Sequence, residues 1–275
     1  MIVDWHLTIE GFYVKIDEMR ILSWNVNGIR SVERKGFVQW LAQESPDILC
    51  IQETKANPSQ LSSELLNTKD KDGNPYFAYW ASAQKAGYSG TAIYSKTEPL
   101  SVSTMGIEEF DAEGRVLQAD FADFSLISAY FPNAQETLAR LGYKLAFCEA
   151  MFEHCGKLVA SGRHLVLCGD YNIAHKPIDL ARPDENEGNS GYLPEERAWM
   201  DKFTASGYVD TFRCLHPNEG SHYTWWTYRK MARSRNVGWR IDYHCVDEGF
   251  FPRVQNALIR SEITGSDHCP VELDI

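Results

Sequence analysis

The chain has 275 residues, a length that suits one large domain or two small ones. Apolar and aromatic residues make up 44% of it, enough for a substantial core, and no run approaches the ~20 apolar residues that a membrane helix needs. The formal net charge of −11 argues against a protein that bulk positive charge holds on nucleic acid, so local clusters of charge matter more.

The first 18 residues precede the first strand-like run. They contain one Lys and four acids, and they lack the charged start, the apolar stretch and the Arg-rich pattern of secretion and import signals. We therefore expect residues 1–18 to be an N-terminal extension and residues 19–275 to form one domain. The seven cysteines include no CxxC pair, which favours a reduced, cytoplasmic protein over one built on disulfides.

Runs of apolar residues bounded by polar ones predict strands along much of the chain. These runs lie near residues 20–26, 47–53, 89–95, 115–121, 125–131, 164–169, 241–247 and 270–275. The runs at 115–121 and 125–131 are separated by a short turn at Ala122 and Asp123, which is typical of an antiparallel hairpin.

Helical periodicity is clearest in residues 138–160. One stripe of this segment holds Leu141, Leu145, Cys148, Phe152, Cys155 and Val159. A second helix opens at Pro194, points Trp199 and Phe203 inward and stops at Gly207, and residues 37–43 form a shorter one. Because the strands at 115–131 lie too close for parallel crossovers, the sequence predicts an α/β protein with mixed sheets in layers.

Polar residues follow several of the apolar runs at the point where each run ends. They are Asn25, Asn27, Glu53, Asp170, Asn172, Asp267 and His268. Because the ends of several buried strands converge on one rim, these side chains are expected to meet there and to form an active site. A rim rich in carboxylates, with one histidine, suits a hard cation such as Mg²⁺.

Each of these groups also has a structural alternative. Asp170 and Asn172 favour turns, but on one side of a strand end they could supply a base and a phosphate-orienting amide. His268 could be structural, or Asp242 could fix its tautomer and keep it protonated. Glu53 follows a wholly apolar strand, where burial is costly unless the carboxylate is paired or bound to a metal.

A segment rich in aromatic residues and cations precedes the last strands. Aromatic residues fill Tyr223–Tyr228 and recur at Trp239, and between Arg229 and Arg240 there are five cations and no acid. A solvated loop and a set of core aromatics would explain this pattern, with Trp226 as a core residue. An anionic ligand held beside a stacking surface explains it better in an acidic protein.

Seven segments together resemble the exonuclease III family of apurinic/apyrimidinic endonucleases, in the DNase I-like superfamily. They occur in family order and span residues 19–275: Ser23–Gly28, Pro46–Lys55, Gly87–Gly90, Ala129–Asn133, Leu167–Asn172, Asn236–Tyr243 and Gly265–Pro270. The resemblance implies one domain with an α/β fold: a four-layer α/β/β/α sandwich of two mixed β-sheets flanked by helices.

The resemblance also implies a role for each matching residue in the reaction. Glu53 is the main Mg²⁺ ligand, with Asn25 beside it and Asp267 contributing, and Mn²⁺ is a substitute metal. Asp170 positions or deprotonates the attacking water, and Asn172 holds the scissile phosphate or the nucleophile. Further residues that touch the phosphate or the leaving oxygen are Tyr130, Asp242 and His268.

Other matching residues are implied to contact DNA. The wall of the pocket for a flipped abasic sugar is made by Trp225, Trp239 and Ile241. Contacts to backbone phosphates fall at Gly87, Tyr88, Asn186 and Asn189. An abasic sugar has no base to unstack, so extruding it costs less than flipping a normal nucleotide, and this difference selects the lesion.

The chain departs from the family pattern in three places. Asn27 stands where some members carry Asp, which weakens the case for a second metal ligand there. Residues 134–136 read Ala-Gln-Glu and lack the arginine that some members insert through the major groove. Arg229 occupies a loop position from which some members insert an apolar wedge into the minor groove, so the grip on duplex DNA could depend more on Arg229.

The sequence therefore predicts a monomeric, Mg²⁺-dependent DNA repair nuclease. It is expected to cleave duplex DNA 5′ to abasic sites and leave a 3′-hydroxyl, with 3′-repair and 3′→5′ exonuclease activity left open. Two alternatives remain: a superfamily phosphoesterase acting on phosphoinositides or lipid head groups, and a non-catalytic nucleic-acid-binding module. The retained Glu53, Asp170, Asp242 and His268 count against the module.

Overall fold

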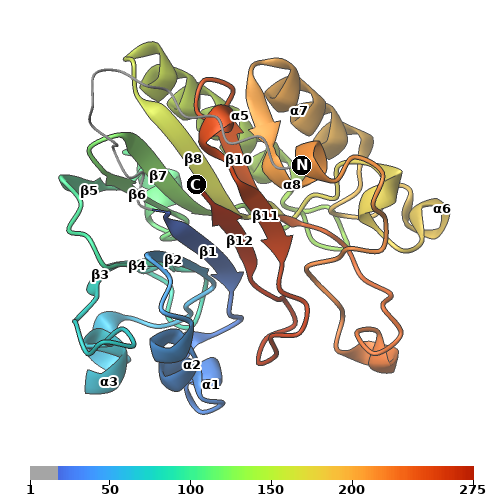
Figure 1. The fold of residues 1–275 in the computed structure, drawn as a ribbon. Helices are drawn as coiled ribbons and strands as arrows, with labels where there is room; N and C mark the ends of the chain where they lie inside the picture. Colours follow the sequence, from blue (N-terminus) through green and yellow to red (C-terminus); the bar gives the residue numbers. More distant parts are fainter. Residues whose placement is uncertain (1–17) are drawn as a thin grey trace, which may run out of the picture.

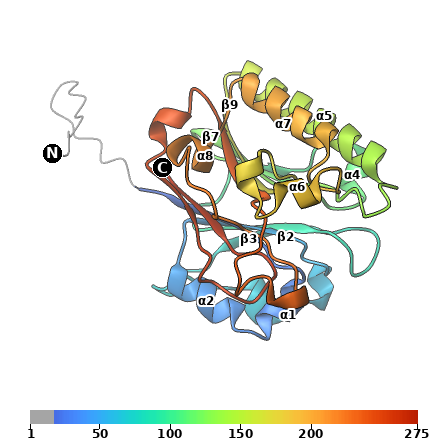
Figure 2. The same ribbon diagram turned by 90° about the vertical axis from the view of Figure 1, so that its right-hand side faces the viewer.

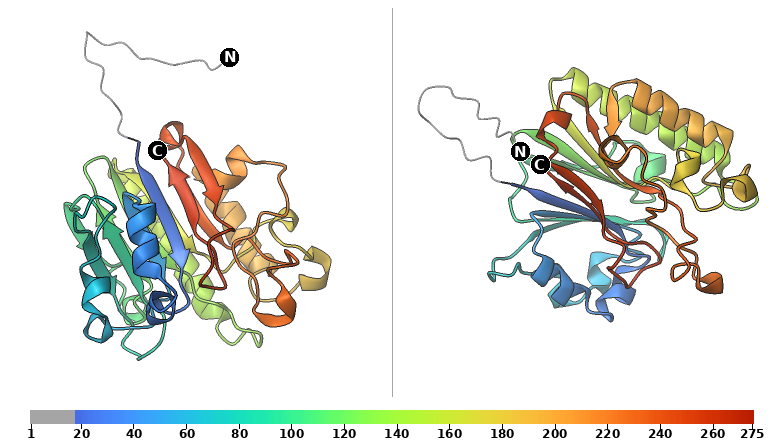
Figure 3. Two further views of the ribbon diagram at one scale, coloured as in Figure 1. Left: turned by 60° about the horizontal axis from the view of Figure 1, so that its bottom comes forward. Right: turned by 45° about the vertical axis from the view of Figure 1, so that its right-hand side comes forward.

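Two β-sheets pack face to face in the computed structural model, which describes residues 18–275 (Figure 1). Within these residues each sheet has six strands. Helices cover the outer face of each sheet, so the layers run helix, sheet, sheet, helix (Figures 2 and 3). This is the predicted four-layer sandwich of mixed sheets.

The first sheet lies next to the N-terminal helices. Its strand order is β11 (Asn256–Ile259), β12 (Val271–Asp274), β1 (Arg20–Asn25), β2 (Ile48–Gln52), β4 (Thr91–Ser95) and β3 (Phe77–Ala81). Strands β1 and β2 are parallel, and the other neighbours are antiparallel. Its outer layer contains α1 (Ile29–Glu33), α2 (Phe37–Glu44), η1 (Pro58–Gln60) and α3 (Ser63–Leu66).

The second sheet carries the two long helices on its outer face (Figure 2). Its strand order is β5 (Ser101–Ser103), β6 (Val116–Asp120), β7 (Phe124–Tyr130), β8 (His164–Asp170), β10 (Asp242–Asp247) and β9 (Tyr208–Asp210). The long helices are α5 (Leu141–Ala160) and α7 (Pro194–Ala205). Shorter helical segments are α4 (Glu108–Asp111), η2 (Pro177–Asp179), α6 (Pro183–Asn186), α8 (Thr211–Leu215), η3 (Arg229–Met231) and η4 (Phe251–Arg253).

Central strands read as unbroken apolar runs because both of their faces are buried. In β1, Ile21 packs between the two sheets, whereas Leu22 and Trp24 pack under the helices. In β2, Cys50 packs between the two sheets and Leu49 packs under the helices. The alternation of side chains along a strand thus feeds two separate apolar layers from one run.

The predicted strands all exist, but four further strands were not predicted. They are β3, β5, β9 and β11, and each is short or partly exposed. Each of the four is an edge strand of its sheet. One side of an edge strand has no neighbouring strand, and the apolar run is interrupted there. The predicted hairpin is confirmed, because β6 pairs antiparallel with β7.

The predicted stripe on the long helix is only partly right. Its fully buried side chains are Lys144, Phe147, Cys148, Met151 and Cys155. A sequence pattern counts lysine as polar, so it excludes Lys144 from the buried face of the helix. The predicted stripe therefore shares only Cys148 and Cys155 with the buried set. On α7, by contrast, Trp199 and Phe203 are buried as predicted, and the helix ends two residues before Gly207.

The expected N-terminal extension, residues 1–18, lies outside the described residues except for its last position. Across residues 18–275, the helices are too short or too polar to cross a membrane. Each of the seven cysteines is free, and six of them are buried, which agrees with the prediction of a protein without disulfides.

Candidate active site

A cleft of about 320 Å³ opens at the rim where strands of both sheets end. Its lining residues are Glu53, Tyr130, Asn133, Asp170, Asn172, Ser190, Gly191, Trp225, Trp239, Ile241, Asp267 and His268. All except Asn133, Ser190 and Gly191 are residues that the family resemblance assigns to the site. The fold thus brings most of the predicted site residues into one cavity.

Sheet register places the ionisable groups side by side at the end of β8. Asp170 is the last residue of that strand, and it faces Tyr130 on β7 and Asp242 on β10. Gly169, with φ of 141°, has no space for a side chain, because a Cβ there would lie 1.8 Å from the carbonyl oxygen of Ala129. Glycine is therefore required where β8 approaches β7 so closely.

Amide groups hold the Asp170 carboxylate. Asn25 Nδ2 donates to Asp170 Oδ2 at 2.8 Å, and the backbone N–H of Asn172 donates to Oδ1 at 2.8 Å. Asn172 Nδ2 also donates to Oδ2, at 3.2 Å, and its left-handed backbone (φ 52°) turns the side chain back toward the carboxylate. Three N–H donors therefore fix the orientation of this buried carboxylate.

His268 and Asp242 form the pair that the sequence could only suggest. Nδ1 of His268 lies 2.8 Å from Asp242 Oδ2, and its Nε2 lies 3.9 Å from Asp170 Oδ2. Burial alone would lower the pKa of His268, but Asp242 and Asp170 raise it to about 10. The imidazole is therefore an imidazolium at neutral pH, with Nε2 directed into the cleft wall beside Asp170.

The pKa of Asp170 is raised above its usual range, to about 7. Burial is the main cause, and the nearby carboxylates Asp242 and Glu53 raise the pKa further, whereas the His268 imidazolium opposes them. A carboxylate whose pKa lies near neutrality can accept a proton from water and release it again. Asp170 therefore has the protonation behaviour of a general base.

Glu53 lines the same cleft and is linked to Asp170 through the Asn25 amide. Its Oε2 contacts Lys55 Nζ at 2.6 Å, and its Oε1 accepts a hydrogen bond from Asn25 Nδ2 at 3.1 Å. Burial alone would raise the pKa of Glu53, but the Lys55 ammonium group and the Tyr130 hydroxyl lower it. Glu53 is thus an ionised carboxylate that already faces a positive charge.

The donor groups fit a hard divalent cation. Glu53 and Asp170 share the Asn25 amide between them, so two carboxylates stand on either side of one amide. Atoms of Asp170, Asp242 and His268 also lie within 4.8 Å of one another, but a protonated imidazole cannot bind a cation, so these three residues form an ion pair cluster and not a second metal site. Asp242 Oδ1 is buried and has no hydrogen-bond partner among the described residues.

Asp267 is more fully engaged than the other predicted metal ligands. Its Oδ1 accepts from Asn27 Nδ2 at 2.9 Å and from the Ser266 hydroxyl at 3.2 Å. Its Oδ2 accepts from Trp225 Nε1 at 3.2 Å. The same contacts tie the aromatic wall of the cleft to the segment that carries His268.

Aromatic and aliphatic side chains form the remaining wall. The Trp225 and Trp239 rings meet edge to face, with their centroids 6.2 Å apart, and Ile241 packs in the same small cluster. Trp226, by contrast, is 3% exposed and belongs to the core, as one of the two alternatives predicted. The cleft therefore has an apolar wall and an ionic wall.

Five of the predicted DNA-contact residues lie outside the cleft: Gly87, Tyr88, Asn186, Asn189 and Arg229. The Tyr88 hydroxyl accepts from Arg115 Nη2 at 2.8 Å and also contacts Arg140, so Tyr88 is fixed at a neighbouring surface. Asn189 Nδ2 donates to Asn186 Oδ1 at 3.1 Å on the loop before Ser190 and Gly191. None of these five residues lines the cleft.

The cation-rich segment divides into structural and exposed members. Arg240 is 1% exposed and pairs with Asp179 and Asp210. The prediction that all five cations of this segment attract an anionic ligand is therefore wrong for Arg240. Arg233 donates to three backbone carbonyls of residues 261–266 and anchors the loop. Arg229, with its neighbours Lys230 and Arg235, remains exposed.

Sequence reasoning missed several residues that complete the site. Asn133 Nδ2 donates to Asn172 Oδ1 at 3.0 Å, although Asn133 stands in a segment already matched to the family. Lys144 Nζ, fully buried, donates to the Asn172 carbonyl and pairs with Glu196, both at 2.6 Å. The signal for Asn133 was its position after an apolar strand, whereas a lysine inside a helix carried no such signal.

Comparison with known proteins places these features in context. A sequence profile of the Endonuclease/Exonuclease/phosphatase family matches residues 22–268. The exodeoxyribonuclease of Bacillus subtilis (strain 168) is 42% identical over 259 residues, which are 94% of this chain and 99% of that protein. The DNA repair nuclease APEX1 of Danio rerio is 44% identical over 260 residues, which cover 93% of this chain and 81% of that protein.

Solved structures agree with these relatives. The AP endonuclease LMAP from Leishmania major superimposes with a TM-score of 0.82 at 28% identity, covering 94% of this chain and 87% of that chain. An AP endonuclease from Archaeoglobus fulgidus gives a TM-score of 0.79 at 30% identity, covering 93% and 98%. The similarity therefore extends over nearly the whole described fold.

Proposed function

Because the chain belongs to the endonuclease/exonuclease/phosphatase family, we propose that its cleft hydrolyses phosphodiester bonds of DNA as an AP endonuclease. The enzyme cleaves duplex DNA on the 5′ side of an abasic site and leaves a 3′-hydroxyl. The observation that carries the proposal is the buried Asp170, held by amides beside the His268–Asp242 pair and below an aromatic wall.

The residues of the cleft divide the work of hydrolysis. Asp170 orients a water molecule and takes its proton as the water attacks phosphorus. The His268 imidazolium neutralises the charge that develops on the phosphate oxygens, and Asn172 orients the phosphate. The 3′-oxygen of the upstream nucleotide leaves next to Tyr130, which accounts for a 3′-hydroxyl product.

A divalent ion supports this chemistry from the Glu53 side. We propose that Mg²⁺, or Mn²⁺ as a substitute, is held by Glu53 with Asn25 and Asp267. When bound, such an ion neutralises the phosphate and the leaving oxygen. Its positive charge would replace that of Lys55 against the Glu53 carboxylate, whose distance to Lys55 Nζ is 2.6 Å.

Selection of the lesion follows from the shape of the cleft. Trp225, Trp239 and Ile241 offer an apolar wall to a sugar without a base. A normal nucleotide must be unstacked and unpaired before it enters, which costs a few kcal/mol more than an abasic one. Gly87, Tyr88, Asn186 and Asn189 lie outside the cleft and are proposed to contact backbone phosphates of the duplex.

The test is cleavage of an end-labelled duplex that contains one tetrahydrofuran abasic analogue, with and without Mg²⁺. We expect a single Mg²⁺-dependent cut on the 5′ side of the analogue, and any 3′→5′ exonuclease activity will add a ladder of shorter products. Soluble inositol phosphates are the competing substrates, and preferential hydrolysis of these would assign the cleft to phosphoinositides. A protein that binds the duplex without cutting any substrate would be a binding module.

The metal assignment is tested by a Mg²⁺ titration of Glu53→Ala. We expect this variant to require more Mg²⁺ while keeping its fold, because the other donors of the cleft remain. Glu98→Ala, at an exposed loop position, is the matched control. An unchanged Mg²⁺ requirement in Glu53→Ala would remove Glu53 from the metal site.

The monomeric state and cytoplasmic location stay predictions.

A further inference from the structure

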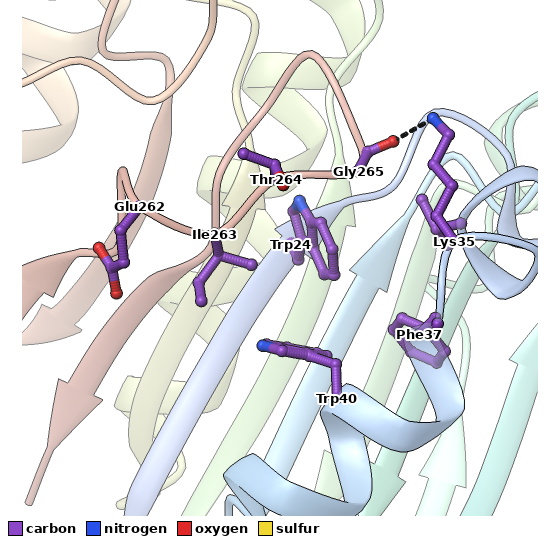
Figure 4. A pocket seen from close by; sticks show the side chains of 10 residues that line it. Trp24, Lys35, Phe37, Trp40, Glu262, Ile263, Thr264 and Gly265 are labelled. Atoms are coloured by element: carbon purple, nitrogen blue, oxygen red, sulfur yellow. Dashed lines mark hydrogen bonds between the residues drawn. The ribbon is translucent and has the colours of Figure 1, made fainter.

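A second cavity, of about 240 Å³, adjoins the active-site loop from the helix side of the first sheet (Figure 4). We call it the tryptophan cavity, and its apolar walls are Trp24, Phe37, Trp40 and Ile263. The segment 262–265 forms one side of it, directly before the residues that line the active-site cleft. Nothing in the proposed DNA-cleaving mechanism uses this cavity.

The walls offer aromatic surface and an unused hydrogen-bond donor. The rings of Trp24 and Trp40 meet edge to face with their centroids 4.9 Å apart, and the ring centroids of Phe37 and Trp40 are 5.8 Å apart. Trp40 Nε1 is buried and has no partner among the described residues, and Figure 4 shows it at the end of the indole ring away from Phe37. A planar ring with acceptor atoms would satisfy both features, and nucleobases are such rings.

One cation, Lys35, stands at the mouth of the cavity. Lys35 extends across it and donates from Nζ to the Gly265 carbonyl at 2.5 Å (Figure 4). Arg30 and Arg34 lie on the adjoining helix and turn, and within residues 18–275 no ion pair joins any of these three cations to a carboxylate. In a chain of net charge −11, this local charge suits a phosphate group.

The acid on the opposite rim, Glu262, contacts Arg260, whose Nε lies 2.7 Å from Glu262 Oε1 and which also pairs with Glu44 and Glu272. The cavity therefore combines an aromatic wall, a buried indole N–H without a partner among the described residues, and an ammonium group at its mouth. A nucleotide carries the three complementary parts: a planar base, acceptor atoms on that base and a phosphate.

We propose that the tryptophan cavity binds one unpaired nucleotide, with its base against Trp40 and its phosphate at Lys35. The proposal rests on the proposed function, because a DNA nuclease meets such nucleotides in its substrate. The ligand is either a free nucleotide or an unpaired residue of a DNA strand. Trp24 Nε1 donates to the His268 carbonyl at 3.2 Å, so the occupied wall also contacts the segment that positions His268.

The experiment measures binding of a fluorescein-labelled pentadeoxynucleotide to the full chain by anisotropy, in EDTA so that no metal holds phosphate in the active-site cleft. Competitors are dAMP and deoxyribose 5-phosphate. We expect Trp40→Leu and Lys35→Ala each to weaken pentanucleotide binding about tenfold, a loss typical of one stacked base. The base-free phosphate should compete at least tenfold less well than dAMP.

Matched controls come from the same protein. Trp80→Leu removes a partly buried tryptophan that also has an unpartnered indole N–H but lies on β3, outside the cavity. Lys71→Ala removes an exposed lysine elsewhere. Both controls should bind like wild type. Because Trp40→Leu could affect folding, Lys35→Ala, at an exposed side chain, provides the independent test.

Two results would overturn the inference: wild-type binding by Trp40→Leu and Lys35→Ala, or competition by deoxyribose 5-phosphate that is measurable and as strong as that by dAMP. If the pentanucleotide depends on Trp40 and dAMP does not compete, the ligand is a nucleotide of a strand. Abasic cleavage is measured on the same preparations. Cleavage without Trp40-dependent binding contradicts only this inference, whereas Trp40-dependent binding without cleavage contradicts only the proposed function.

Discussion

Asp170 is the residue on which the contacts of the active site converge. It accepts hydrogen bonds from Asn25 and from two N–H groups of Asn172, and His268 Nε2 lies 3.9 Å away. Burial raises its pKa to about 7, helped by the neighbouring carboxylates. A residue so held has one orientation, and its proton affinity suits transfer at neutral pH.

Replacing Asp170 with Asn should remove the base and keep the shape. We expect the single-turnover rate on an abasic duplex to fall by about 10²–10⁴-fold, with little change in DNA affinity. In either orientation the new amide also places its N–H₂ group against a former donor, because the Asn172 backbone N–H faces one oxygen position and Asn25 Nδ2 faces the other. Rate and affinity are measured on the same duplex, and retention of most single-turnover activity would remove Asp170 from the mechanism.

His268 and Asp242 should act as one unit, because 2.8 Å separates Nδ1 from the carboxylate oxygen. We expect His268→Ala to lower turnover strongly, and Asp242→Ala to cost less once His268 is absent. The measurement is a double-mutant cycle of single-turnover rates. Fully additive losses would show that the two residues do not work as a pair.

At the scale of elements, the loop that contains η3 has an unusual backbone conformation. Lys230 and Met231 both have left-handed backbone, with φ of 56° and 47°, and the Met231 side chain is 76% exposed. Arg233 ties the loop to residues 261–266. The loop therefore presents Arg229 and Lys230 outward from an anchored base, which suits a contact with DNA outside the cleft.

Arg229→Ala should weaken duplex binding and flatten its salt dependence by about one unit of slope. A guanidinium group contacts phosphate or enters a narrow minor groove, and either contact releases a counterion. Cleavage at saturating enzyme should change much less, because Arg229 lies outside the cleft. Abasic-duplex affinity is measured over a salt series, with Lys157→Ala on the outer helix as control. Parallel lines of equal affinity would leave Arg229 a solvated residue.

Helices α5 and α7 are joined by an ion pair that also reaches the active site. Lys144 and Glu196 are both 0% exposed and 2.6 Å apart, and Glu196 accepts the backbone N–H groups of Gly191 and Leu193. Lys144 also donates to the carbonyl of Asn172. The pair thus connects two helices, the loop that lines the cleft and the backbone of Asn172.

Lys144→Met should lower the free energy of unfolding by about 3–5 kcal/mol, because it leaves Glu196 buried without its counter-charge. Urea denaturation measures this loss. Lys157→Met, an exposed position on the same helix, should change the stability by no more than about 0.5 kcal/mol. Equal effects of the two substitutions would mean that the buried pair is not structural.

At the scale of the whole molecule, Arg240 links segments that are distant along the chain. Its guanidinium group bonds Asp179 at 2.8 Å and Asp210 at 2.7 Å, and Arg213 also reaches Asp179 at 2.7 Å. Burial alone would raise the pKa of Asp179, but Arg240 and Arg213 lower it to about 2. The network therefore holds η2, which contains Asp179, close to β9 at the edge of the second sheet.

This network should make stability depend on acid pH. The pKa of Asp179 is lower in the folded state than its ordinary value of 3.8, so its contribution is present above about pH 4 and is lost as pH falls toward 2. The pKa difference corresponds to about 2 kcal/mol. Urea unfolding at a series of pH values should show a smaller acid loss in Asp179→Asn than in wild type. Identical pH dependence would assign the acid loss to other carboxylates.

Much of the fold was already readable from residue patterns. Strands β1, β2 and β8 are apolar on both faces, so their runs are unbroken and end abruptly at polar residues. The positions of Glu53 and Asp170 after such runs predicted the rim, and ordered motifs predicted the sandwich. Edge strands such as β5 escaped prediction, because one exposed face removes the continuous apolar signal.

What only the tertiary structure decided are the partners that come from distant parts of the chain. His268 meets Asp242 across 26 residues, Arg240 meets Asp179 across 61, and Lys144 meets Glu196 across 52. A sequence pattern records the polarity of each side chain but not which opposite charge the fold will bring to it. Local hydrophobic periodicity therefore determined the layers of this protein, whereas the charges inside them, and the tryptophan cavity beside the site, depended on packing between elements.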